Sequence, residues 1–334
     1  MKVAVQTPAM GGAFKYILYG IINALEAAGV TVVTDRHNEL YKRHEVDLYI
    51  GSLSHAKGNL YSERVEEFQR LPNCKYALHS QPFVDHLDEI KSLREKPRFN
   101  PTDIELKTAN IVNPEVIWGY GWDNHAHLWE KWGRKWQSFM PAGDSVRFFD
   151  KQSGRGRDMV FLGGDWPYKR PAINEIINAL KAIVPKVDLN VAGWGRARTV
   201  PFGMGNEFLN TGRVGFCPSE PHTKLLGIDV PERVFKLPLA GVAAVHDKVP
   251  FLARNLPNVP IGSTGMAVAE LCFNLVEHEM NRLAVQIAQK HYVLANHTYF
   301  CRLKSLANAL NMPELEAKMD KKIPKSEVFE AKNG

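Results

Sequence analysis

The sequence predicts an α/β fold made of two successive units, each built on a parallel sheet. Short apolar runs alternate with longer segments of helical periodicity, which is the pattern of βαβ units. The pattern stops near the middle of the chain, in a stretch rich in glycine and charge, and then begins again. A chain of 334 residues, at roughly 150 residues per domain, is long enough for two such domains.

The composition is that of a globular protein with apolar cores. Hydrophobic residues make up 45% of the chain and charged residues 23%, which excludes disorder as its main state. No apolar run reaches the ~20 residues of a membrane span, and strand-like residues begin at Lys2, so we expect neither a span nor a signal peptide. The net charge of +6 permits a polyanionic partner such as nucleic acid but does not require one.

Several chemistries are excluded by what the sequence lacks. Four cysteines are scattered without a CxxC pair, which favours buried free thiols in a reducing cytosol: Cys74, Cys217, Cys272 and Cys301. His125 and His127 lack a third ligand at metal-binding spacing, so no metal site is expected. The sequence also has no GxSxG elbow, no Walker A loop and no HExxH motif.

The first unit is expected to span residues 1–142. Residues 2–6 form a strand, residues 13–28 form a helix that stops at Gly29, and residues 30–34 form a second strand. This order is a βαβ unit and therefore implies parallel strands. The other elements expected here are strands at 46–50, 75–79 and 110–113, and helices at 61–70 and 124–132.

Residues 143–157 are expected to link the two units, because they combine glycines with charged residues. The second unit is expected at 158–290, followed by helices at 291–320 and a frayed tail at 321–334. Its elements are strands at 158–162, 187–192, 216–217 and 243–245, and helices at 171–183, at 231–240 and within 266–310. Ligands of parallel sheets bind beyond the carboxyl ends of the strands, so the crevice between two such units is the expected site.

Gly11 and Gly12 follow the first strand and precede the first helix. Glycines let the backbone approach a ligand closely, and the helix N-terminus offers free N–H groups. The stretch is not the GxGxxG of dinucleotide-binding proteins, and Asp35 meets the expected acidic position only loosely. A nicotinamide cofactor is therefore not favoured, and a simple tight turn is the alternative.

Cations open two helices of the second unit. Gly163 precedes one of them and Lys169 and Arg170 begin it, an arrangement that suits a pyrophosphate beside a helix N-terminus. Glu232 and Arg233 open the other; Arg233 is a candidate for a phosphate group, and Glu232 for the hydroxyl groups of a ribose. The alternatives are a solvated Lys–Arg pair in the first case and a surface capping cluster in the second.

His79 ends an expected strand of the first unit, where functional residues of parallel sheets gather. A structural histidine is the alternative. An aromatic cluster follows it: Trp118, Tyr120, Trp122, Trp129, Trp132 and Trp136. Such rings stack on sugars or bases, but packing in the core is the favoured interpretation.

Three stretches carry a resemblance to a known family: Phe161–Gly164 with Lys169–Arg170, Pro231–Lys236 with Gly241, and His297–Arg302. In order and spacing they resemble a glycosyltransferase of the GT-B fold, and more narrowly the CgeB/YkvP-like group of family 1 glycosyltransferases of spore-forming bacteria and phages. Pro8–Gly29 is similar to the start of the acceptor domain in these enzymes. Pro141–Asp144 with Phe148–Phe149 is similar to their crossing between domains.

The resemblance implies two Rossmann-like domains that face each other across a cleft, with C-terminal helices crossing back. It implies a nucleotide-sugar donor, a UDP-sugar, bound without a metal mainly by the second domain. The residues that it places at this donor are Gly11, Gly12, Gly163, Lys169, Arg170, Gly193, Trp194, Ser219, Glu232 and Arg233. Lys236 stands where the family has a ribose-binding Glu, and a cation cannot accept those hydrogen bonds. Either Glu232 substitutes, or the donor differs, or donor binding has been lost.

The implied reaction transfers a sugar to an acceptor hydroxyl in the cytoplasm of a bacterium or a phage-infected cell. An inverting enzyme requires a base on the first domain, and His79 and Asp85 are the candidates because both follow a strand that ends at the cleft. The acceptors considered are a hydroxymethylated base in phage DNA, a glycan, a protein and a small molecule. Two alternatives remain, a non-catalytic nucleotide- or glycan-binding protein on the same scaffold and a nucleotide-sugar epimerase.

Overall fold

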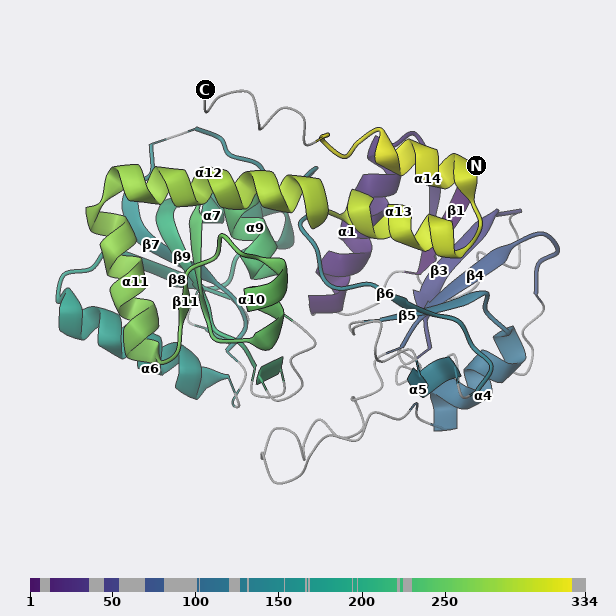
Figure 1. The fold of residues 1–334 in the computed structure, drawn as a ribbon, viewed down its shortest axis with the longest axis horizontal. Coiled ribbons are helices and arrows are strands. Elements are labelled where there is room, and N and C mark those ends of the chain that lie inside the picture. The colour runs from purple at the N-terminus through teal and green to yellow at the C-terminus, as the bar shows by residue number, and fades with distance from the viewer. Residues whose placement is uncertain are drawn as a thin grey trace. The chain divides into compact units, whose positions relative to one another are not determined.

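The chain folds into two compact units, shown in a computed structural model (Figure 1). The first unit combines Met1–Met140 with Tyr299–Ile323, and Pro141–Thr298 makes up the main segment of the second. The structure describes residues 1–6, 13–35, 45–53, 70–80, 101, 103–119, 127–130, 132–152, 154–165, 167, 169–193, 195–196, 198–220, 223–224 and 230–325.

A six-stranded parallel sheet in the order β2-β1-β3-β4-β5-β6 forms the centre of the first unit. Its strands are β1 (Lys2–Gln6), β2 (Thr31–Asp35), β3 (Leu48–Ser52), β4 (Lys75–His79), β5 (Val116–Gly119) and β6 (Trp136–Ser138). Its described helices are α1 (Ala13–Ala27), α4 (Asp103–Val112), α5 (His127–Glu130), α13 (Tyr299–Ala309) and α14 (Pro313–Asp320). Because all the strands are parallel, their carboxyl ends lie at one edge of the sheet.

The C-terminal segment completes the core of the first unit. Helix α13 packs on α1, where a Cβ atom added to Gly20 would lie 2.2 Å from the ring of Tyr299. The segment also buries a set of leucines completely: Leu303, Leu306 and Leu315. A side chain at Gly20 would therefore displace the returning helix.

Two lysines of the sheet bind the end of α13. Lys75 Nζ, at the start of β4, donates hydrogen bonds to the carbonyl groups of Leu310 and Asn311. Lys135 Nζ, just before β6, donates to the carbonyl of Ala309. The last carbonyls of a helix have no partner within it, so these lysines cap α13 and fasten it to the sheet.

A five-stranded parallel sheet in the order β11-β10-β9-β7-β8 forms the centre of the second unit. Its strands are β7 (Arg157–Leu162), β8 (Leu189–Ala192), β9 (Gly212–Cys217), β10 (Ala243–Asp247) and β11 (Ile261–Gly262). Its described helices are α6 (Arg170–Ile183), the short 3-10 helix η6 (Phe202–Met204), α7 (Gly205–Leu209), α9 (Arg233–Leu239), α10 (Pro250–Asn255), α11 (Gly265–Glu277) and α12 (Glu279–Asn296). Side chains of β7, β9 and β10 form one core with those of α6 and α11.

The two parallel sheets confirm the predicted α/β class, but the strand expected at 110–113 is wrong. Those residues end α4, and Asn113 follows with a φ of 51°, the left-handed conformation that closes many helices. The adjacent residues Ile111 and Val112 are β-branched, a type enriched in strands, and this led to the wrong prediction. The strand of this region is β5, and the helix expected at 124–132 is described only as α5.

Of the four members of the aromatic cluster that the structure describes, three belong to the core, as favoured from the sequence. Trp118 and Trp129 are fully buried and Trp136 is nearly so, whereas Trp132 is 52% exposed. The other two members, Tyr120 and Trp122, lie outside the described residues, as does most of the helix expected at 61–70.

Two further expectations differ from the structure in detail. Residues 143–157, expected as a linker, are grouped with the second unit, where Asp144 and Phe148 are buried. Three of the four free cysteines are buried as expected, but Cys301 is partly exposed.

Candidate functional site

The candidate site lies at the carboxyl ends of β7 and β9 in the second unit. The chain passes from β7 to β8 on one side of β7, and then crosses to β9 on its other side. Parallel sheets bind their ligands at such a switch point, because the loops after the two strands diverge there. The loops that leave β7, β8 and β9 begin with Gly163, Gly193 and Pro218.

Arg233 reaches this point from the first turn of α9. Its side chain is buried, Nε donates to the carbonyl of Leu162 at 2.6 Å, and the guanidinium lies over the ring of Phe161 at 4.4 Å. Among the described residues, Nη1 is buried without a hydrogen-bond partner. Burial lowers the pKa of Arg233, but a guanidinium remains charged at neutral pH. A buried cation with an unengaged donor is what an anionic ligand would satisfy.

Two glycines make room for this guanidinium. A Cβ atom at Gly163 would lie 2.0 Å from Nη2 of Arg233. Gly193 has a φ of 148°, and a Cβ atom there would lie 2.0 Å from the carbonyl oxygen of Gly163. The loops after β7 and β8 therefore approach each other, and Arg233, more closely than any other residue type allows.

Lys169 brings a second buried cation to the site from the N-terminus of α6. It is 4% exposed, and its Nζ lies 3.6 Å from Oε1 of Glu220. Burial and, next, repulsion by Arg233 lower the pKa of Lys169, while Glu220 opposes the shift. An anion bound between these two cations would remove their repulsion.

Arg170 and Arg196 share the carboxylate of Asp165. The Arg170 side chain is 52% exposed and its Nε donates to Oδ2 of Asp165 at 3.1 Å. Arg196 is largely buried, with Nε 3.3 Å from the carbonyl of Gly163 and Nη2 3.4 Å from Oδ1 of Asp165. Sequence reasoning missed Arg196, although it follows the end of β8 as other site residues follow their strands.

Ser219 is held by Asp247, another residue that the sequence did not reveal. The Ser219 Oγ–H donates to Oδ1 of Asp247 at 2.7 Å, and its backbone N–H lies 3.0 Å from both carboxylate oxygens. The only hydrogen of this hydroxyl is therefore engaged within the protein. Ser219 can accept a hydrogen bond from a ligand but has none left to donate to a phosphate.

Glu232, the N-cap residue of α9, and Lys236 within the helix form a largely buried ion pair, with Nζ and Oε2 2.5 Å apart. The Lys236 ammonium also lies 5.1 Å from the centre of the Phe148 ring. Burial lowers the pKa of Lys236, and the charge of Glu232 opposes the shift. Lys236 thus orients the carboxylate of Glu232. That Glu232 binds the ribose in place of the family's Glu stays a prediction.

Of the predicted site residues of the first unit, the structure describes only His79. It ends β4, as expected, but its ring is fully buried and lies edge-on to Trp118, with ring centres 4.6 Å apart. The next residue, Ser80, donates from Oγ to the buried carboxylate of Glu105 at 3.0 Å, a pair that the sequence did not reveal. Asp85, Gly11, Gly12 and, in the second unit, Trp194 lie outside the described residues.

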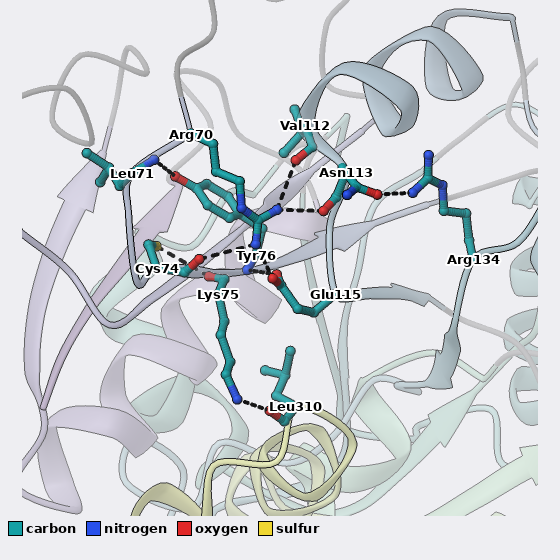
Figure 2. Close-up of polar contacts among 10 residues, drawn as sticks. All are labelled: Arg70, Leu71, Cys74, Lys75, Tyr76, Val112, Asn113, Glu115, Arg134 and Leu310. Atoms are coloured by element: carbon teal, nitrogen blue, oxygen red, sulfur yellow. Dashed lines mark hydrogen bonds and ion pairs between the residues drawn. The ribbon is translucent and has the colours of Figure 1, made fainter.

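A hollow of about 540 Å³ at the opposite, amino edge of the first sheet is a rival site. Arg70 lines this hollow, and Figure 2 shows it donating to the carbonyls of Val112, Asn113 and Cys74 and to the carboxylate of Glu115. Glu115 also accepts from the N–H of Tyr76. Burial raises the pKa of the Cys74 thiol to about 11, so it stays protonated and unreactive. The charged side chains here bind the protein itself, and the hollow is structural.

Metal and membrane features are absent from the part of the chain that the structure describes. It contains no group of three or more Cys, His, Asp or Glu side chains placed to hold an ion. None of its helices is both long and apolar enough to cross a bilayer.

Comparisons with known proteins identify the fold. The sequence matches no family model and no curated protein. The structure is similar to T4 phage BGT in complex with UDP-glucose, with a TM-score of 0.55 at 11% identity over 97% of this chain and 100% of that one. It is also similar to Anabaena Alr3699/HepE in complex with UDP and glucose (TM-score 0.58, 12% identity, 93% and 99% covered).

A third similar structure is an α-glucosyltransferase in complex with UDP and a 13-mer DNA containing an HMU base (TM-score 0.60, 10% identity, 93% and 99% covered). Another T4 phage BGT structure, with a TM-score of 0.53 at 10% identity over 97% of this chain and 100% of that one, holds UDP and Mn2+. At these identities the likeness establishes the fold. The chain has the GT-B architecture of two parallel-sheet units.

Proposed function

We propose that this protein transfers a sugar from a nucleoside diphosphate sugar, a UDP-sugar, to an acceptor hydroxyl. One observation carries the proposal: two buried cations, Lys169 and Arg233, meet at the switch point of the second sheet, and Arg233 has a buried donor without a partner among the described residues. A diphosphate supplies the negative charge that this arrangement lacks. The four similar structures reported above contain UDP or UDP-glucose, which supports this choice of donor.

The same cations account for the chemistry of the donor. When the bond between the sugar and the diphosphate breaks, negative charge accumulates on the leaving phosphate. Arg233 and Lys169, fixed by burial, stabilise that charge without having to reorganise. We therefore propose a reaction that needs no metal. Activity that persists in excess EDTA supports this, whereas activity lost in EDTA and restored by Mn2+ contradicts it.

The narrower CgeB/YkvP-like assignment is part of the proposal. Residues from each of the three stretches that suggested it are in contact within the second unit. Arg233 of the second stretch lies over Phe161 of the first, and Phe235 of the second stacks on His297 of the third at 5.4 Å. Residues so distant in sequence but in contact in space support a common motif.

The base of an inverting reaction is proposed to be His79 or Asp85. His79 has the right place at the end of β4, but its complete burial requires the ring to become accessible when substrate binds. Replacing each residue separately by Ala tests the pair: the base is the one whose loss abolishes transfer while UDP affinity is kept. If both variants keep full activity, neither residue is the base.

The acceptor that we propose is DNA carrying a hydroxymethylated base. The support is the DNA in one similar structure and the net charge of +6. The charge excess is modest in the first unit, where 22 Lys and Arg face 20 Asp and Glu, so specific contacts must contribute. Transfer to hydroxymethylated but not to unmodified DNA, with binding that weakens steeply as salt is added, is expected. Transfer to a glycan, a protein or a small molecule instead replaces DNA as the acceptor.

Nucleotide binding tests the function as a whole. UDP at 100 times its Kd is expected to stabilise the folded protein by about 2.7 kcal/mol, a shift that thermal unfolding detects easily. Lys169→Met should remove most of the shift, whereas Lys181→Met, on the exposed face of the same helix, should leave it intact. No shift with UDP, GDP, ADP, CMP or dTDP overturns the proposal. The buried Glu232–Lys236 pair then favours a protein that has lost donor binding.

Conversion of UDP-sugar without any acceptor identifies a nucleotide-sugar epimerase instead. Chromatography of the sugar nucleotide after incubation with the protein alone separates this outcome from transfer.

A further inference from the structure

We infer that Asp247 is a positioning residue of the donor site, a role that rests on the proposed function. Asp247 ends β10, next to the strand that leads into the site. Strand β10 pairs with β9 as far as His246 and Cys217, after which the β9 chain leaves the sheet. Beyond this point the carboxylate of Asp247 replaces the backbone hydrogen bonds between the two segments, because it accepts hydrogen bonds from both the N–H and the hydroxyl of Ser219.

This carboxylate is itself firmly held. His246 Nδ1 lies 2.9 Å from Oδ1, and Lys224 Nζ lies 2.9 Å from Oδ2. Burial acts to raise the pKa of Asp247, but these two partners outweigh it and keep the pKa well below its usual range. Asp247 is therefore ionised at neutral pH. Its hydrogen bonds to Ser219, the start of the loop after β9, are charge-assisted and hence stronger than neutral ones.

The loop that Asp247 holds faces a buried cation of the site. Glu220, the residue after Ser219, lies 3.6 Å from Nζ of Lys169 and opposes the drop in the lysine pKa. A shift of the loop changes both the position and the charge balance of Lys169. Asp247 thus acts on the diphosphate through Ser219, Glu220 and Lys169, without touching it.

The test compares UDP affinity, by calorimetry, in the full chain and in four variants. Ser219→Ala removes one hydrogen bond to Asp247 and is expected to weaken UDP binding about threefold to tenfold. Asp247→Asn removes the charge and is expected to weaken it by more than about tenfold. The double variant should bind within about twofold of Asp247→Asn, because residues in one network do not act independently. Asp188→Asn, an exposed partner of Arg157 at the other edge of the same sheet, is the matched control and should bind as wild type.

Amide hydrogen exchange gives the readout that distinguishes positioning from stability. In Asp247→Asn the N–H groups of Ser219 and Glu220 should exchange faster, with the core strands unchanged. Unchanged UDP affinity in both single variants, or losses that multiply in the double variant, overturns the inference and leaves the proposed function standing. A wild-type protein that binds no nucleotide overturns both. If Asp247→Asn does not fold, Ser219→Ala decides alone, since it removes only one hydroxyl group.

Discussion

Two arginines, one at an edge of each sheet, have opposite environments. Arg70, at the amino edge of the first sheet, keeps a third of its side chain exposed yet donates four hydrogen bonds to its own chain. Arg233, at the carboxyl edge of the second sheet, is buried and leaves a donor without a partner among the described residues. Judged by exposure alone, Arg70 would be taken for the ligand-binding arginine and Arg233 for the structural one. The engagement of the donors, rather than burial, separates an arginine that builds the fold from one kept for a ligand.

Replacing Arg233 by Met is the strongest way to break this comparison. UDP affinity is expected to fall by about 100-fold, because a charge-assisted contact to a diphosphate is lost. The free energy of unfolding without ligand should stay the same or rise, since a buried cation with one unengaged donor has been removed. Calorimetry and urea unfolding measure the two quantities. A large loss of stability with normal UDP affinity would show that Arg233 belongs to the same class as Arg70.

Replacing Arg70 by Met should give the converse result. The unfolding free energy is expected to fall by about 1–3 kcal/mol, because two helix-terminal carbonyls and Glu115 lose their partner at a partly exposed position. UDP affinity should not change. The same urea and calorimetric measurements apply. Weaker UDP binding at full stability would instead assign a ligand to the hollow around Arg70.

Gly163→Ala sharpens the comparison without touching a charge. The added Cβ would lie 2.0 Å from Arg233 Nη2, so the guanidinium must move and UDP affinity should fall by about tenfold. Gly154→Ala is the control, because nothing lies within 4 Å of a Cβ atom there. Equal UDP affinities in the two variants would show that the position of the Arg233 guanidinium does not matter for binding.

The smallest expected effect is a dependence on pH that comes from Lys169. Its pKa is lowered in the folded protein, mainly by burial, so above that pKa the unfolded chain binds more protons than the folded one. Its contribution to stability therefore grows as pH rises toward the ordinary lysine value, by at most about 1.4 kcal/mol per pH unit. Saturating UDP should reduce this slope, because a diphosphate favours the charged amine.

The difference between wild type and Lys169→Met isolates this slope from the other groups that titrate in the same range. Urea unfolding at several pH values measures it. A slope that is identical in both proteins removes Lys169 from the titrating site.

Much of the fold followed from local sequence patterns, and the errors have local causes. The strands at the start of each unit and the helices that begin with Arg170 and Arg233 were readable, because each couples an apolar run with a turn or a capping signal. The end of α4 was not, since Ile111 and Val112 suit a strand as well as the last turn of a helix.

Only part of the candidate site could be predicted from the sequence, and the reason differs from that for the fold. Lys169 and Arg233 could be predicted as candidate site residues of the second unit because cations at the start of a helix are visible in the sequence. Asp247 meets Ser219 only because β10 lies beside β9, and strand order is not a local property. Burial was equally hard to predict: of two adjacent cations, Lys169 is buried and Arg170 is half-exposed. Sequence periodicity at a helix boundary does not distinguish them.

The lysine caps on α13 have a consequence for the order of events during synthesis. All the strands of the second unit lie within Pro141–Thr298, so they are synthesised in one uninterrupted run. The core of the first unit is completed later, because α13, which packs on α1 through Tyr299, is made only after these strands. Until Lys75 and Lys135 receive the end of α13, the nascent first unit presents an open apolar face to the cell. The first unit therefore begins synthesis before the second but completes its core only after the strands of the second have been made.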